Sequence, residues 1–281
     1  MKKVLIGFIL LVSLGAIVAY QYTGFYDGKL HVVFCDVGQG DAIFIRTPNG
    51  LDILVDGGPD DKVLSCLSSH MPFWDRDSEL VILTHPHADH LNGLISVVKH
   101  YKVLSFATEN LKNNTAVFNA LMHELKDQSI QIRYVYAGDR FKFKDGVSFD
   151  IVGPSREFLQ KTSPNGVIGE RNEFANVESL VKFKNFSALL TGDSQASELN
   201  EGDIDVLQVP HHGSSTGLNA KVLDSIKPKL AVISVGKKNK YGHPAPTTLE
   251  ILRKKDIKIL RTDQQGNIEI ISDGLTWNQG F

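Results

Sequence analysis

The chain has 281 residues, of which 42% are hydrophobic and 22% charged, a composition that is ordinary for a globular protein and argues against disorder. This length suffices for one large domain or two small ones. The formal net charge of −2 excludes a whole-protein basic field that attracts nucleic acid, so a polyanionic substrate would need a local basic patch.

The amino terminus predicts a membrane-directed segment. Two lysines precede an uncharged, mostly apolar run from Val4 to Tyr20, as in a signal peptide or a short membrane anchor. Ile17-Val18-Ala19 is a poor cleavage site, so an uncleaved anchor and a cleaved signal both stay open. Either way the lysines should stay inside, so we expect a membrane-held or secreted protein with its domain outside the cytoplasm. We divide the chain into residues 1–27, signal peptide or anchor, and 28–281, one domain.

The first part of this domain predicts strands followed by helices. The turn-forming sequences Gly38-Gln39-Gly40 and Pro48-Asn49-Gly50 separate short apolar stretches, which predicts a β-meander. The expected strands are residues 30–35, 42–46, 52–55 and 80–83, and apolar residues at helical spacing predict helices near 61–69, 91–100 and 116–125.

The second part repeats this order. We expect strands between residues 130 and 152, a polar surface insertion with a short helix over 154–176, and a closing hairpin across Gln265-Gly266. Further strands are expected at 179–183, 187–191, 206–209 and 230–235, with helices at 220–226 and 247–254. Strands followed by alternating strands and helices, twice over, predict an α/β fold, a four-layer αββα sandwich.

The two cysteines give no functional signal. Cys35 and Cys66 each lie in an apolar stretch, and neither belongs to a CxxC or Cys-His metal motif. We favour two buried free thiols over a single disulfide, since free cysteine is among the most buried residue types.

The run His85-Pro86-His87-Ala88-Asp89-His90 directly follows an apolar strand. His85 and His87 alternate on an extended segment, so both imidazoles point to one side, while Asp89 and His90 can face a second point. Imidazole and carboxylate ligands suit zinc best, with manganese or iron as alternatives. Four ligand-type residues in six make a chance polar loop a poor explanation.

Two further loops support this prediction. Thr191-Gly192-Asp193 ends one apolar strand with a carboxylate that could bridge two metal ions, and Pro210-His211-His212-Gly213-Ser214 ends the next with two imidazoles. Strand ends converge at one edge of such a sheet, where active sites collect. Apart from the histidines of these loops and His243, the histidines fit ordinary surface or core positions.

These motifs resemble the metallo-β-lactamase superfamily and, within it, the hydrolase domain of ComEC-type DNA-uptake proteins, in a stand-alone form. The resemblance covers residues 30–272 or so. Besides the three loops above, its motifs are Asp36-Val37-Gly38-Gln39-Gly40-Asp41, Val55-Asp56-Gly57-Gly58, Ser234-Val235-Gly236 and Tyr241-Gly242-His243-Pro244.

The resemblance implies a two-metal centre. In such a centre the first metal would be bound by His85 and His87. The second would be bound by Asp89, His90 and His211, and both metals would be bound by Asp193. His212 is the alternative to His211, and Asp56 would orient a ligand histidine from behind. The superfamily usually supplies a third histidine to the first metal, but no histidine occurs here from Glu124 to Pro210. An Asn- and Ser-rich stretch, Asn172 to Ser179, stands there as in ComEC-like domains, so Asn176, Ser179 or water would complete the first site, or it is empty.

Two metals would activate a water as nucleophile, with Asp89 or Asp193 orienting it. His243 could donate a proton to the leaving oxygen with help from Tyr241. A lysine-rich loop lies next to His243. Its members are Lys237, Lys238 and Lys240. They are equally compatible with a phosphate-binding patch and with a solvated turn.

We therefore expect a metal-dependent phosphodiesterase, a nuclease acting on DNA outside the membrane in uptake or scavenging. Zinc is the expected cofactor, with manganese as the alternative. Two other functions stay open. One is another hydrolase of this fold, namely a wall phosphoester esterase, a lactonase or a β-lactamase, because fold does not fix substrate. The other is a non-catalytic module that binds DNA or metal.

Overall fold

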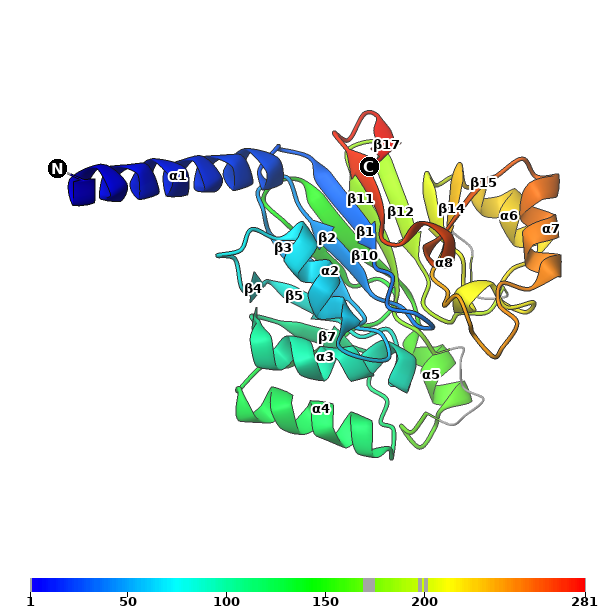
Figure 1. Cartoon of the computed structure of the whole chain (residues 1–281). Helices are drawn as coiled ribbons and strands as arrows, with labels where there is room; N and C mark the ends of the chain where they lie inside the picture. The colour runs from blue at the N-terminus through cyan, green and yellow to red at the C-terminus, as the bar shows by residue number, and fades with distance from the viewer. Residues whose placement is uncertain (1, 169–174, 197–198, 200–201, 281) are drawn as a thin grey trace.

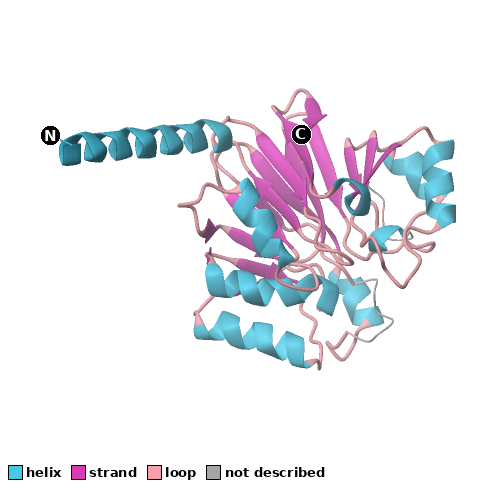
Figure 2. Cartoon of the chain, viewed as in Figure 1, coloured by secondary structure: helices cyan, strands magenta, loops and turns pink. Residues whose placement is uncertain are grey.

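The computed structural model describes residues 2–168, 175–196, 199 and 202–280 (Figure 1). Two β-sheets stack face to face, and helices cover both outer faces (Figure 2). The first sheet has the strand order β17 (Trp277–Gln279), β16 (Ile268–Ser272), β1 (Leu30–Phe34), β2 (Ile43–Arg46), β3 (Asp52–Val55), β5 (Leu80–Ile82), β7 (Phe106–Thr108) and β8 (Ile132–Tyr134). The second has the order β15 (Lys258–Arg261), β14 (Leu230–Ile233), β13 (Val206–Gln208), β12 (Phe186–Leu190), β11 (Glu178–Phe183), β10 (Val147–Gly153) and β9 (Arg140–Lys142). A small ribbon pairs β4 (Asp77–Ser78) with β6 (Lys102–Val103).

Residue alternation along the strands explains the layers. In β1, Val32 and Phe34 point into the core between the two sheets, while Val33 points to the outer core beneath the helices. Both faces of the sheet are therefore buried, as expected for a sheet covered on both sides. The predicted four-layer αββα sandwich and its β1–β3 meander are confirmed.

Helices form the two outer layers. The helices α2 (Lys62–His70), α3 (Ala88–His100) and α4 (Ala116–Asp127) contribute to the outer core of the first sheet. The helices α6 (Ala220–Ile226) and α7 (Pro246–Lys254) contribute to that of the second. The predicted insertion carries α5 (Arg156–Thr162), and its residues 169–174 lie outside the described part of the chain.

The amino-terminal run forms one long helix, α1 (Lys2–Phe25), which projects from the domain (Figure 1). It is the one helix among the described residues that is long and apolar enough to cross a membrane. None of its residues is buried.

Two expectations were wrong. The chain does not form a hairpin across Gln265-Gly266, because β15 pairs with β14 in the second sheet, the short helix α8 (Thr262–Gln265) follows, and β16 pairs with β1 in the first. The terminal hairpin joins β16 to β17 instead. The cysteines are not free thiols either. Cys35 and Cys66 face each other in the outer core beneath α2 and form a disulfide, with their Cα atoms 5.8 Å apart.

Candidate metal centre

Loops from both sheets meet at one end of the sandwich. Asp56 follows β3 and His85 follows β5, two parallel neighbours whose ends lie at the same edge. Asp193 and His212 follow β12 and β13, parallel neighbours in the other sheet. The strand-end convergence expected from the sequence therefore places these four loops together.

A first group of ligand-type side chains consists of His85, His87 and Asp193, whose ligand atoms lie within 4.8 Å of one another. His85 Nε2 is 3.8 Å from Asp193 Oδ2. His85 is buried, whereas His87 is half-buried and borders the surface. The first two histidines of the HxHxDH run thus come together with the predicted bridging aspartate.

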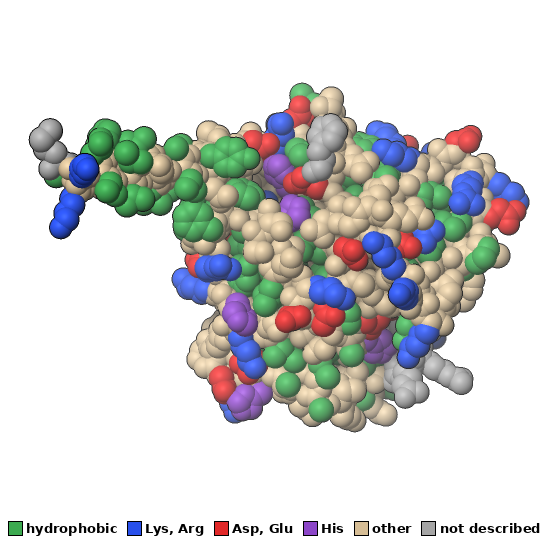
Figure 3. Space-filling view, viewed as in Figure 1, with side chains coloured by type: hydrophobic (Ala, Val, Ile, Leu, Met, Phe, Trp, Pro, Cys, Tyr) green, Lys and Arg blue, Asp and Glu red, His purple; other side chains and the backbone are tan. Residues whose placement is uncertain are grey.

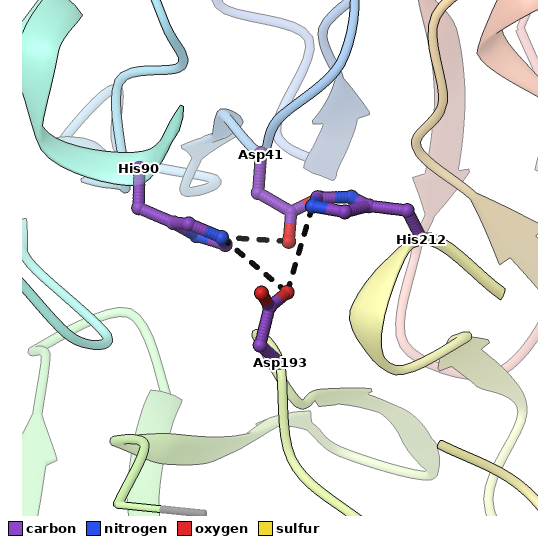
Figure 4. Close-up of side chains that lie close together, drawn as sticks. All are labelled: Asp41, His90, Asp193 and His212. Atoms are coloured by element: carbon purple, nitrogen blue, oxygen red, sulfur yellow. Dashed lines mark ion pairs between the residues drawn. The ribbon is translucent and has the colours of Figure 1, made fainter. Parts of the chain in front are cut away.

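A second group consists of Asp41, His90, Asp193 and His212, all of them buried (Figure 4). His90 Nε2 and His212 Nε2 lie 3.3 and 3.6 Å from Asp193 Oδ1. The Nδ1 atoms of the same two histidines lie 3.8 and 3.7 Å from the oxygens of Asp41. Asp193 belongs to both groups, so it is placed to bridge two ions.

Three histidines are held by their Nδ1 atoms in a way that leaves Nε2 available. His212 Nδ1 lies 3.1 Å from the carbonyl oxygen of Ser234, which only accepts, so Nδ1 carries the proton. His90 Nδ1 lies 2.7 Å from Asp56 Oδ2. Thr84 Oγ1 donates to the same carboxylate and can accept from His85 Nδ1 at 3.1 Å. Once its Nε2 proton is lost, each imidazole would therefore turn a lone pair toward Asp193, which is how metal-binding histidines are oriented.

The buried polar atoms left over fit a metal ion. Within the described part of the chain no hydrogen bond reaches either carboxylate oxygen of Asp41, Oδ1 of Asp193, or the Nε2 atoms of His85, His90 and His212. Buried polar atoms are almost always hydrogen-bonded, so this concentration needs an explanation. Divalent metal ions would satisfy these nitrogen and oxygen donors together, and the set suits zinc or manganese.

The electrostatics of the cluster point the same way. Burial opposes ionisation of Asp193, but His90 and His212 outweigh it and hold the pKa of Asp193 well below its usual value. Burial likewise opposes charging of His90, yet Asp193 and Asp56 raise its pKa well above 6.5. The pKa of His212 is raised to about 9 against burial, chiefly by Asp193 and Asp41. Positive charge is thus favoured here, and a metal ion would displace these protons.

The backbone around the cluster is strained. His211 and His212 both have left-handed φ angles, 52° and 55°, and Asp56 has 60°. Such conformations cost about 1–3 kcal/mol each for non-glycine residues and collect at functional sites. A Cβ on Gly93 would lie 1.9 Å from the Gly57 carbonyl oxygen, so only glycine lets α3 approach closely enough to set His90 on Asp56.

Other predicted residues lie around the cluster rather than within the two groups. His211 Nε2 is 3.7 Å from Asp193 Oδ2, and Asp89 Oδ2 is 3.5 Å from His212 Nε2. The geometry favours His212 over His211 for the second group, opposite to the preference from sequence. Asn176 Oδ1 accepts the N–H of Asp193 and so fixes the loop that carries this aspartate. Ser179 is buried in β11, and its Oγ has no hydrogen-bond partner among the described residues.

Sequence reasoning missed two residues, Asp41 and Gln39. Asp41 ends the motif Asp36-Val37-Gly38-Gln39-Gly40-Asp41, two residues before β2. Its N–H donates to the Asp89 carbonyl oxygen, which ties it to the first turn of α3. Gln39 accepts from the N–H of Gly236 and lines the opening to the cluster. A carboxylate in a glycine-rich turn before a buried strand was the signal available.

The cluster opens into a cavity of about 260 Å³. Its lining residues are Gln39, His87, Asp89, Asp193, His211, His212, Tyr241 and His243. The rings of Tyr241 and His243 stack with their centroids 5.9 Å apart. The centroids of the His243 and His211 rings are 5.7 Å apart. Burial and the neighbouring His211 lower the pKa of His243.

Two adjoining hollows carry the lysine loop. Gln39 lines all three hollows, and Lys238 and Asn239 line both of the outer ones. Lys237 borders one outer hollow and Lys240 the other, beside Tyr241 and Asp89. The exposed lysines therefore lie in hollows that border the one at the metal cluster.

The chain is similar to a known protein family and to two curated proteins. The profile of the "Metallo-beta-lactamase superfamily" matches residues 35–153. The chain is 27% identical to ComE operon protein 3 of Bacillus subtilis over 273 residues, which cover 86% of this chain and 33% of that protein. It is 29% identical to Recombination protein 2 of Haemophilus influenzae over 246 residues, covering 84% and 28%. It thus spans about a third of the length of these curated relatives.

A solved structure shares the fold. The metallo-beta-lactamase fold protein YhfI of Bacillus subtilis superimposes with a TM-score of 0.56, covering 89% of this chain and all 100% of that one. Only 10% of the residues are identical, so the likeness is one of architecture.

Proposed function

We propose that the chain is a metallo-β-lactamase superfamily protein of the ComEC-like kind, and that it is a metal-dependent phosphodiesterase that hydrolyses DNA or a similar polyanion. The observation that carries this proposal is that the hollow at the buried His/Asp cluster shares Gln39 with the two hollows lined by Lys237, Lys238 and Lys240. A reacting phosphodiester could lie at the cluster while neighbouring phosphates contact the lysines. The name of one relative, Recombination protein 2, supports nucleic acid as the substrate class.

The proposed ligands follow from the geometry. His85, His87 and Asp193 would hold one ion, and His90, His212 and Asp193 the other, with Asp41 and Asp89 close by. A divalent ion held there supplies an activated water nucleophile and neutralises charge that develops on the attacked ester. We propose zinc, with manganese as the alternative, since both accept imidazole and carboxylate ligands.

The protein's own residues would position the substrate. His243 and Tyr241 form a stacked pair at the mouth of the cavity, where an imidazole N–H can donate to a phosphate oxygen or to the leaving oxygen. Asp89, half-buried beside His212, can orient the attacking water. The three exposed lysines would neutralise neighbouring phosphates.

The same proposal includes the location. The helix α1 has hydrocarbon side chains on all sides and lysines at its free end, as a membrane anchor requires. With Lys2 and Lys3 inside, the domain of residues 28–281 would lie outside the cytoplasmic membrane. The Cys35–Cys66 disulfide supports this, because disulfides persist in oxidising compartments.

The test is hydrolysis of bis(p-nitrophenyl) phosphate and labelled single-stranded DNA by the full chain, with Zn²⁺, Mn²⁺ or a chelator. We expect metal-dependent turnover that His87→Ala abolishes and His123→Ala leaves intact, since His123 is an exposed histidine on α4. Turnover that survives chelation, or that survives in His87→Ala, would overturn the proposed site. Turnover of nitrocefin or a lactone instead would redirect the proposal to another hydrolase of this fold.

A second candidate is a module that binds DNA and metal without catalysis. The observation that favours it is the first group, in which three ligand-type side chains of the described residues meet and one of them, His87, is half-buried. Metal bound at one site, DNA bound with salt-dependent affinity and no turnover with any metal would support this candidate over the enzyme.

A further inference from the structure

The anchor helix is attached to the domain by direct contacts. Arg46 Nε donates to the Phe25 carbonyl oxygen at 3.1 Å, and its guanidinium lies over the Tyr26 ring, 4.7 Å from the centroid. Tyr26 in turn packs so closely on Gly50 that a Cβ there would lie 2.4 Å from Tyr26 Cε1. These contacts fix the direction in which α1 leaves the domain, and therefore which face of the domain meets a bilayer.

Two large side chains next to this junction are exposed. Phe73 and Trp74, in the loop between α2 and β4, have exposed fractions of 56% and 40%. The Phe73 N–H donates to Gln21 Oε1 of α1 at 3.3 Å. Gln21 directly follows the apolar run that ends at Tyr20, so it marks the depth at which the helix would leave the hydrocarbon. The loop is thereby held at that depth.

The length of α1 agrees with this placement. Its 24 residues span about 36 Å at the helical rise, against a hydrocarbon core of about 30 Å. In Figure 3 apolar side chains cover the helix, with basic residues at its free tip. Tyr20 and Tyr22, both exposed near its other end, lie where aromatic belts form in membrane proteins.

We propose that Phe73 and Trp74 insert into the headgroup region of the bilayer beside α1 and dock the domain on the membrane surface. The inference rests on the proposed anchoring by α1. Lipid is the occupant because the loop adjoins the helix exit, and Trp with other aromatics prefers the interface. Asp75, Arg76 and Asp77 follow directly, so the loop carries no excess of positive charge, and docking should need no anionic lipid.

Docking in this way fixes the direction in which the metal cluster opens. β3 begins at Asp52, which pairs with Arg46 at the anchor junction, and its other end leads to Asp56 beneath His90. Four residues of strand span about 13 Å. The cluster would therefore open away from the lipid, toward a polymer arriving from the aqueous side.

The test uses the full chain in nanodiscs of zwitterionic lipid brominated near the top of the acyl chain, with tryptophan emission as readout. Of the two tryptophans, Trp277 packs against the core and its Nε1 donates to Asp205, so it serves as an internal reference. We expect the Trp74 emission of the wild type to be quenched and the emission of Trp74→Phe to stay nearly unchanged, because a Trp74 ring at the membrane interface would contact the brominated chains. Adding Tyr134→Trp to Trp74→Phe moves the tryptophan to the opposite end of the parallel strand β8, where quenching should not return.

The outcomes separate the two proposals. Quenching that depends on Trp74, and is equal with and without anionic lipid, supports docking. A chain that stays in the nanodisc but shows no quenching of Trp74 overturns docking and leaves anchoring in place. A chain that is not retained by the nanodisc overturns the anchoring and the docking together, without bearing on hydrolysis.

Discussion

The two ends of the β-sandwich are built in opposite ways. At the anchor end, Arg46 and Asp52 are both about 2% exposed, and Arg46 Nη1 donates to both oxygens of the carboxylate at 2.8 and 2.7 Å. At the metal end, no hydrogen bond among the described residues reaches the carboxylate oxygens of Asp41, Oδ1 of Asp193 or Nε2 of His212, and the backbone of His212 is left-handed. The first arrangement is complete by itself, whereas the second is complete only with a ligand. We expect changes at the anchor end to alter stability, and changes at the metal end to alter metal binding and activity.

The largest effect should come from Asp193→Asn, because Asp193 belongs to both ligand groups. We expect the metal content to fall at both sites. The loss of activity should exceed the loss of about 10–100-fold that is typical for a residue supporting a metal ligand. Metal content by mass spectrometry and phosphodiesterase turnover measure this directly. Asp224→Asn, an exposed carboxylate on α6, is the control. Normal metal content in Asp193→Asn would show that this end of the sandwich is not a metal centre.

At the other end, Arg46→Met should leave Asp52 buried without its partner. Breaking a buried pair in this way typically costs about 3–5 kcal/mol of unfolding free energy. Urea unfolding in detergent measures the loss, and turnover per folded molecule should stay unchanged. The double variant Arg46→Met with Asp52→Leu should recover much of the stability, since it removes the unpaired charge. A single variant as stable as the wild type would remove the contrast between the two ends.

Asp56→Asn tests the support behind the ligands. An amide can still accept from the Thr84 N–H, but it carries no charge to hold the Nδ1 proton of His90. We expect metal affinity to fall by about 10–100-fold with the fold retained. Glu109→Gln is a matched control: Glu109 is also fully buried at a neighbouring strand end, but it accepts from Thr108 rather than from a histidine. Equal losses in the two variants would point to a general effect of burial instead.

Much of the metal end could be predicted because its signals are local. His85 and His87 stand in the loop after β5, His90 follows in the first turn of α3, and Asp193 stands in the loop after β12. Strand ends in a layered fold converge. The same reasoning gave the β-meander and the helices that cover the sheets, because apolar periodicity is a property of neighbouring residues.

The remainder depends on pairing between distant segments. Asp41 enters the cluster because its backbone is tied to the first turn of α3, 48 residues further along the chain at Asp89. The preference for His212 over His211 depends on left-handed φ angles at both residues, which a bulky side chain rarely adopts. The Cys35–Cys66 disulfide joins β1's end to α2 across a separation of 31 residues. None of these contacts leaves a trace in local spacing.

The smallest predicted effect is that of a change in His31, which lies between two carboxylates at the anchor end. Its Nδ1 is 2.8 Å from Glu269 Oε1 and its Nε2 is 3.0 Å from Asp27 Oδ1. Burial opposes protonation of His31, but hydrogen bonds to Glu269 and Asp27 outweigh it and raise its pKa. A raised pKa in the folded state means that the stabilisation is fully present below the unfolded value of about 6.5 and is lost as pH rises through the folded value. We therefore expect the Tm difference between wild type and His31→Gln to be larger at pH 6 than at pH 9. Comparing the two proteins at each pH cancels the titration of the metal-end histidines, and a difference that does not change with pH would mean that His31 stays neutral between its two carboxylates.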